Sequence, residues 1–103
     1  MKKSEIVAKC AEFGEFYIHY EKLKPGTKGT TYLQGTMDFE GDRYIQRKLK
    51  EANGAFRNER EGFVLVFSRT NDNFRYIPVE KIRRITSLQS ELDRASPVGQ
   101  FRR

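Results

Sequence analysis

A segment rich in proline and glycine separates two stretches of this chain in which apolar and polar residues alternate. The segment covers residues 24–29 and reads Lys-Pro-Gly-Thr-Lys-Gly. Proline fixes φ and glycine adopts positive φ, so this composition is typical of a turn. Residues 15–24 and 30–39 alternate on either side of it, as the strands of a half-buried sheet do. We therefore predict a β-hairpin here, with a bulge or a sharp bend at Gly35 in the second strand.

A second strand–turn–strand unit follows later in the chain. Residues 63–67, Phe-Val-Leu-Val-Phe, form the most apolar run of the sequence. Such a short run is typical of a central, buried strand. Residues 70–73, Thr-Asn-Asp-Asn, have the composition of a turn, and residues 74–77 can form the returning strand. The sequence therefore predicts a second hairpin.

Three segments have apolar residues at helical spacing. Residues 4–13 predict a helix that Ser4 caps and Gly14 ends. Residues 42–53 fit a helix capped by Asp42, and they also fit a strand. Residues 79–93 fit either a helix or a single helical turn that leads into a last strand.

The length and composition limit the chain to one small domain. With 103 residues there is room for a single core, and we assign it to residues 1–93 with a flexible basic tail over 94–103. Cys10 is the only cysteine, which excludes an intramolecular disulfide and a cysteine-based zinc site. There is neither an apolar signal segment nor a run of about 20 apolar residues. We therefore expect a cytoplasmic protein.

Few residues suit catalysis. His19 is the only histidine and lies in a predicted strand, and no nucleophile-elbow sequence accompanies it. Cys10 has apolar neighbours and is interpreted as a small core residue. Asp38, Glu40 and Asp42 alternate in a way that can hold a divalent cation, but a solvated loop that also caps the next segment explains them better. We predict a protein that is not an enzyme and uses neither a cofactor nor a metal.

The net charge points to a polyanionic partner. Twenty Lys and Arg residues outweigh fourteen Asp and Glu residues, which gives a formal charge of +6. Such a protein associates with phosphate backbones or with acidic protein surfaces. Between residues 43 and 60 the cations are interleaved with aromatic and amide side chains. A second candidate group lies at the second hairpin and consists of Arg69, Arg75 and Tyr76, with Arg83 and Arg84 nearby in sequence. Cations can neutralise phosphates, while Tyr and Gln side chains can stack on or read bases. The predicted nucleic-acid contacts are Arg43, Tyr44, Gln46, Arg47, Lys48, Lys50, Arg57, Arg60, Arg75 and Tyr76.

The order of these features resembles the Sm-like family of small barrels. The residues that carry the resemblance to the first family motif are Gly35, Met37, Asp42, Tyr44, Ile45, Gln46 and Leu49, with roughly one extra residue between Met37 and Asp42. Residues 76–85 are similar to the fourth strand, helical turn and fifth strand of such barrels, and also to the end of WYL-type regulatory domains. The resemblance implies a short helix followed by five bent strands, RNA binding, and assembly into rings. It also implies that residues 42–53 form a strand and that Asp42, Tyr44 and Gln46 line a base pocket.

The sequence as a whole predicts a mostly β fold, a small Sm/SH3-like barrel of about five strands with an N-terminal helix. The alternative is an α+β fold in which two β-hairpins pack with helices. The predicted function is that of a small basic regulatory protein that contacts RNA or single-stranded nucleic acid and can form a homo-oligomer. The alternative is a protein-binding regulator or inhibitor, for example a viral host-takeover factor, that docks on an acidic surface of its partner.

Overall fold

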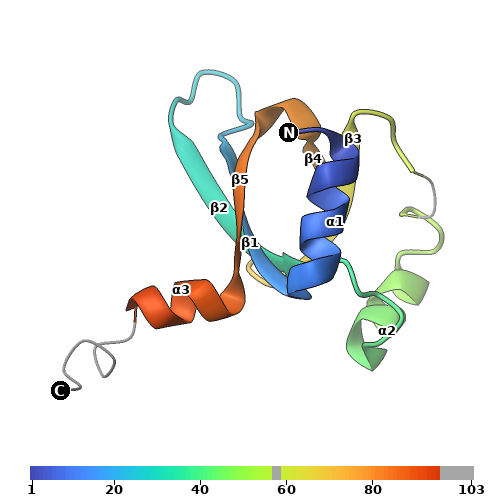
Figure 1. The fold of residues 1–103 in the computed structure, drawn as a ribbon. Coiled ribbons are helices and arrows are strands. Elements are labelled where there is room, and N and C mark those ends of the chain that lie inside the picture. Colours follow the sequence, from blue (N-terminus) through green and yellow to red (C-terminus); the bar gives the residue numbers. More distant parts are fainter. Residues whose placement is uncertain (57–58, 96–103) are drawn as a thin grey trace, which may run out of the picture.

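Five antiparallel strands form one curved sheet in the computed structural model of the protein, which describes residues 1–56 and 59–95 (Figure 1). The strands are β1 (Glu15–Glu21), β2 (Thr30–Thr36), β3 (Phe63–Ser68), β4 (Asn73–Pro78) and β5 (Ile82–Ser87). Their order is β4-β3-β2-β1-β5, so β4 and β5 form the two edges. Both predicted hairpins are confirmed as β1–β2 and β3–β4. The five strands and the N-terminal helix are present as predicted. The sheet stays open between its two edges, so the fold has the α+β arrangement that was the predicted alternative to a barrel.

The helices are α1 (Lys3–Phe13), α2 (Arg43–Glu51) and α3 (Leu88–Ala95), and a 3₁₀ turn, η1 (Val79–Lys81), joins β4 to β5. Helix α1 begins before Ser4, so Ser4 is not its cap. Instead the Glu5 carboxylate accepts a hydrogen bond from the Lys2 backbone N–H at 2.8 Å. Gly14 ends the helix at a φ of 74°, as predicted.

The structure decides both ambiguous segments. Residues 43–51 are helical, so the strand that the family resemblance implied is wrong there. The cause is local: the Asp42 carboxylate accepts hydrogen bonds from the N–H groups of Tyr44 (2.8 Å) and Ile45 (3.2 Å), which satisfies two donors at the start of α2. After Pro78 a single helical turn leads into β5, which was one of the two predicted alternatives. The chain becomes helical again only in α3. Helix α3 includes the first two residues of the predicted tail, and residues 96–103 lie outside the described residues.

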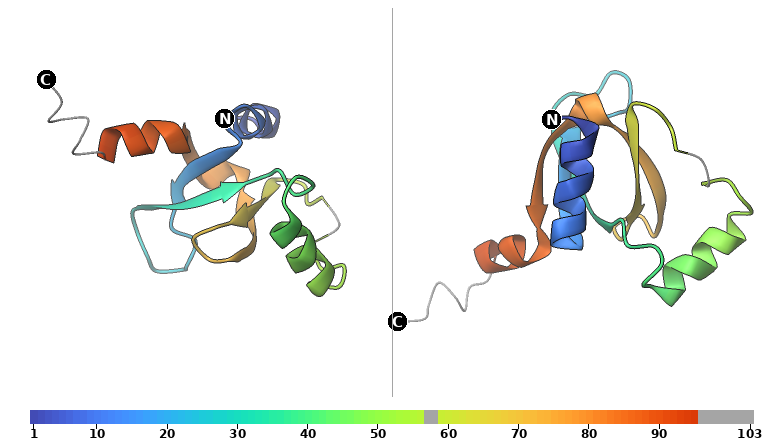
Figure 2. Two further views of the ribbon diagram at one scale, coloured as in Figure 1. Left: turned by 90° about the horizontal axis from the view of Figure 1, so that it is seen from below. Right: turned by 45° about the vertical axis from the view of Figure 1, so that its right-hand side comes forward.

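The main core lies on the concave face of the sheet. Helix α1 crosses the open side between β5 and β3 (Figures 1 and 2) and buries Ile6 and Cys10 against Phe16 and Ile18 of β1. Cys10 is therefore a core residue, as predicted, and its burial raises the pKa of its thiol to about 12. Within residues 1–56 and 59–95, no helix has both the length and the apolar character that crossing a bilayer requires.

A second apolar cluster lies on the convex face of β3 and β4. Ile45 of α2 packs there with Phe67 and Phe74, and Phe39 and Phe56 cover them from the β2–β3 connection. Strand β3 is therefore buried on both faces, because Val64 and Val66 belong to the main core. This double burial explains the unbroken apolar run in its sequence.

Gly35 marks a close backbone approach in place of the bulge that the sequence suggested. Pairing between β1 and β2 passes through Gly35 without a shift in register, and the irregularity falls between His19 and Tyr20 in the pairing with β5. A Cβ atom at residue 35 would lie 2.7 Å from the backbone carbonyl oxygen of Phe67. Only glycine allows β3 to approach β2 so closely at this point.

We therefore predict that Gly35→Ala destabilises the protein by about 1–3 kcal/mol, because the added methyl group overpacks a backbone contact. Urea unfolding followed by circular dichroism measures this. Thr30→Ala, at an exposed position of the same strand, should change the free energy of unfolding by less than about 0.5 kcal/mol. Equal effects of the two substitutions would contradict this account of Gly35.

Candidate nucleic-acid interface

Helix α2 presents one apolar face and one basic face. Ile45 is buried and Leu49 is half-buried against the sheet. Arg43, Arg47 and Lys50 are exposed and follow the i, i+4, i+7 spacing that places side chains on one helical face. With a rise of about 1.5 Å per residue, they form a cationic stripe about 10 Å long. Helix α2 lies at the outer side of the sheet (Figure 2), and the exposure of these three residues shows that the basic face is turned to solvent.

The turn between β3 and β4 holds two other predicted residues of α2. The Tyr44 hydroxyl donates a hydrogen bond to Asp72 Oδ1 at 2.7 Å, and Lys48 Nζ lies 3.7 Å from Asp72 Oδ2. The hydrogen bond to Asp72 raises the pKa of Tyr44. Tyr44 and Lys48 therefore fix the helix to the hairpin, and the cationic stripe does not include them.

Arg69 fixes the first turn of the same helix. Its Nη2 atom lies 3.0 Å from Glu15 Oε2 on β1 and 3.0 Å from Asp42 Oδ2 at the cap of α2. The hydrogen bond from Arg69, with the N–H groups that Asp42 caps, lowers the pKa of the Asp42 carboxyl. The sequence grouped Arg69 with possible nucleic-acid contacts, but two carboxylates neutralise it here.

The three residues assigned to a base pocket by family resemblance all bind other groups of the protein. Asp42 caps α2 and pairs with Arg69, and Tyr44 bonds to Asp72. Gln46 Nε2 donates a hydrogen bond to the Phe39 carbonyl oxygen at 2.7 Å. In this structure their polar groups hold α2 and its preceding loop in place.

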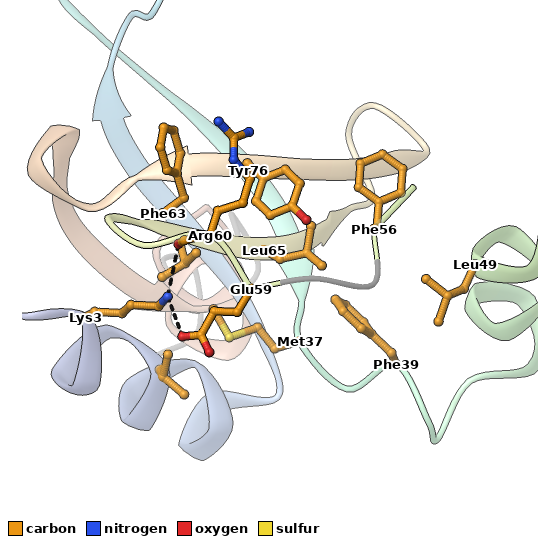
Figure 3. A pocket seen from close by; sticks show the side chains of 12 residues that line it. Lys3, Met37, Phe39, Leu49, Phe56, Glu59, Arg60, Phe63, Leu65 and Tyr76 are labelled. Carbon is orange, nitrogen blue, oxygen red and sulfur yellow. Dashed lines mark hydrogen bonds and ion pairs between the residues drawn. The ribbon is translucent and has the colours of Figure 1, made fainter. Parts of the chain in front are cut away.

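An aromatic pocket of about 500 Å³ lies beside α2, between α1 and the convex face of β3 and β4 (Figure 3). Its lining residues are Lys3, Val7, Met37, Phe39, Leu49, Phe56, Glu59, Arg60, Phe63, Val64, Leu65 and Tyr76. The Arg60 guanidinium carbon lies 4.3 Å from the ring centroid of Phe63 and 4.8 Å from that of Tyr76. Lys3 Nζ bonds to Glu59 Oε1 at 2.7 Å and to the Arg60 carbonyl oxygen at 3.3 Å, which ties this rim of the pocket to α1.

The pocket is connected to α2 through a shared lining residue. A second hollow runs along the helix and is lined by Gln46, Arg47, Leu49 and Lys50. Leu49 lines both hollows. The structure therefore brings Arg47 and Lys50 next to the pocket that contains Arg60 and Tyr76, four of the residues predicted from sequence.

Two predicted residues do not join this surface. Arg75 pairs with Val66 across β4 and β3, and successive side chains of a strand point to opposite faces, so it lies on the other face from Tyr76. Arg57 lies outside the described residues.

Sequence reasoning missed a second basic region, at the loop end of the β1–β2 hairpin. Lys22, Lys28, Lys81 and Arg83 surround a hollow of about 400 Å³. Glu21 neutralises part of it, because it pairs with Lys81 at 3.6 Å and with Arg83. The lysines in the predicted turn over residues 24–29 are the sequence feature that could have indicated this region.

The carboxylates near α2 do not gather into a metal site. Asp38 Oδ1 accepts a hydrogen bond from the Gly41 N–H at 3.1 Å, and Asp42 is used by α2 and Arg69. In the part of the chain that the structure describes, no group of three or more His, Cys, Asp or Glu side chains is placed to hold a metal ion.

No family model, curated protein or solved structure matches this chain. The resemblance to the Sm-like family stays a prediction that rests on its motif residues.

The paired Asp42 predicts a defined pH dependence of stability. Since its pKa is lower in the folded than in the unfolded state, ionised Asp42 stabilises the fold above the unfolded pKa. This contribution is lost as the pH falls through the folded pKa. Asp42→Asn keeps a side chain that caps helices but removes the charge. We expect the variant to lose less stability than the wild type between neutral pH and about pH 3, measured by urea unfolding.

A matched pair of variants identifies the cause. In an Arg69→Met background, Asp42→Asn should alter the pH dependence much less, because the main partner of the carboxylate is gone. If Asp42→Asn has the same effect in both backgrounds, the Arg69–Asp42 pair is not the source.

Proposed function

We propose that this protein binds RNA or another single-stranded nucleic acid and acts as a small regulatory protein of the cytoplasm, by binding and without catalysis. One observation carries the proposal: a hollow along α2 that Arg47 and Lys50 line shares Leu49 with an aromatic pocket. A polyanion that also carries flat rings matches both parts of such a surface.

The cations of α2 are available for phosphates. Among the described residues, none forms an ion pair with Arg43, Arg47 or Lys50, and all three are exposed. The neighbouring Lys48, in contrast, pairs with Asp72. Each phosphate that a free cation neutralises releases counterions, which contributes to affinity and makes binding dependent on salt.

The pocket suits unpaired bases. Phe63, Tyr76 and the planar guanidinium of Arg60 offer the kinds of surface on which bases of single strands stack. Its volume of about 500 Å³ lies within the range of pockets that take small organic ligands. Bases inside a duplex cannot enter such a pocket without leaving the stack, so the surface favours single strands.

We predict that replacing Arg43, Arg47 and Lys50 together by Gln weakens oligonucleotide binding and reduces its salt dependence. Each lost phosphate contact lowers the slope of log affinity against log salt by about 0.7 for single strands, so the triple variant should lose about 2. Fluorescence anisotropy with a labelled single-stranded RNA, titrated at several salt concentrations, measures both quantities.

The control removes the same charge elsewhere. Lys22, Lys24 and Lys28 are exposed in the β1–β2 loop, far from α2 (Figure 1), and their replacement by Gln changes the net charge equally. This variant should keep most of the affinity and slope. Salt-independent binding, or no binding by the wild type, would contradict the proposed function.

A second candidate function is the regulation of a partner protein, and the edge of the sheet favours it. Within the described residues, β4 pairs only with β3, so its other edge is open to a strand from a partner or from a second copy. A pull-down from lysate treated with nuclease separates the two functions, because a protein target survives the treatment and a nucleic-acid target does not.

A further inference from the structure

The convex face of β1, β2 and β5 carries a row of polar and aromatic side chains away from α2. Phe16 and Ile18 of β1 point into the core, so Tyr17 and His19 point outward. Tyr32 of β2 lies directly across from His19 on one side, and Arg84 of β5 lies across from it on the other.

The rings in this row form a continuous surface, which we call the Tyr32 platform and which comprises Tyr17, His19 and Tyr32. The ring centroid of Tyr32 lies 5.5 Å from that of Tyr17 and 5.9 Å from that of His19. Tyr32 is 57% exposed, the highest value among the large exposed hydrophobic side chains of the described residues. Its ring is therefore open to a partner.

Helix α3 forms a wall at the side of the platform. A hollow of about 280 Å³ lies between the three rings and Glu91 and Leu92 of α3. Thr86 Oγ1 donates a hydrogen bond to Glu91 Oε2 at 2.5 Å and lies 3.1 Å from His19 Nε2. These contacts fix α3 against β5 and β1, so the hollow is built into the fold.

The charges around the platform favour an anionic partner. Arg84 is the partner of His19 across β1 and β5, so its cationic side chain lies beside the platform. Glu91 is the carboxylate of the hollow, and its Oε2 atom lies 3.5 Å from His19 Nε2 and 3.8 Å from Arg94 Nη2. The carboxylate is therefore paired inside the protein, while Arg84 is exposed.

The platform and the aromatic pocket lie on the same face of the sheet. Thr36 and Tyr32 are an even number of residues apart in β2 and so share a face, and Thr36 pairs with Phe67 of β3. Phe67 in turn lies on the face of β3 that carries Phe63 and Leu65 of the pocket. Helix α2 covers Phe67 between the two sites, so a nucleic-acid strand that reaches both passes over α2.

We propose that the Tyr32 platform is a second stacking site, which takes one or more bases of the same single-stranded nucleic acid while Arg84 contacts its phosphates. This inference rests on the proposed function. Exposed ring faces on a sheet stack bases with little dependence on sequence, and a neighbouring arginine supplies the charge that the backbone requires.

Substitutions at Tyr32 test this inference. Tyr32→Ala removes the exposed ring, and Tyr32→Phe keeps the ring and removes only the hydroxyl. Stacking contributions measured in other proteins predict that the alanine variant binds single-stranded RNA roughly 5- to 150-fold more weakly. The phenylalanine variant should bind within about twofold of the wild type, and the salt slope should be unchanged in both because no cation is lost. Anisotropy titrations measure these values, and thermal unfolding confirms that both variants fold.

The outcomes separate the two proposals. Binding by Tyr32→Ala that equals the wild type would overturn the platform and leave the α2 surface as the binding site, with the platform open to a protein partner. An equal loss in both variants would also overturn it, because the ring would then not matter. Absence of binding by the wild type would overturn the proposed function and the platform together.

Discussion

Arg69 joins three segments of the chain that are distant in sequence, and the placement of the candidate site depends on it. Its guanidinium pairs with Glu15 at the start of β1 and with Asp42 at the cap of α2. Asp72, in the same β3–β4 turn, holds Tyr44 and Lys48. Ion pairs and hydrogen bonds thus hold the first turns of α2 to the second hairpin, while Ile45 packs on Phe67 and Phe74. With the helix fixed in this way, its remaining cations point outward beside the aromatic pocket.

Local patterns predicted most of the fold. Turn composition at residues 24–29 and 70–73 and the alternation around them identified both hairpins, because these signals act within a few residues. The segment at Asp42 was ambiguous because its apolar residues fit two periods. The Asp42 cap favours the helix locally, and a tertiary contact adds to it, because Ile45 and Leu49 cover a part of β3 that lies well over ten residues further along the chain. Gly35 was noted as special, but its reason, the approach of the Phe67 carbonyl oxygen, arises from strand pairing that the sequence does not reveal.

The candidate site was predictable only in part. Helical spacing is enough to place Arg43, Arg47 and Lys50 on one face once α2 is known to be a helix. The pocket could not be predicted from the sequence. Its residues Arg60, Phe63 and Tyr76 come together only through the pairing of β3 with β4 and the course of the loop before β3. The same geometry separates Arg75 from Tyr76, although they are neighbours in sequence. Lys48 and Arg69 belonged to basic clusters in the sequence, yet carboxylates from other elements neutralise them.

The central claim is that a single-stranded nucleic acid contacts the outward face of α2 and the pocket beside it. A titration of ¹⁵N-labelled protein with a single-stranded RNA, followed by amide chemical shifts, tests it most directly. The account predicts progressive shifts at Arg43, Arg47 and Lys50 and at the pocket residues Arg60 and Phe63, with little change in the β1–β2 loop. Saturable binding that leaves α2 and the pocket unmoved, or shifts confined to the β1–β2 loop, would contradict the account.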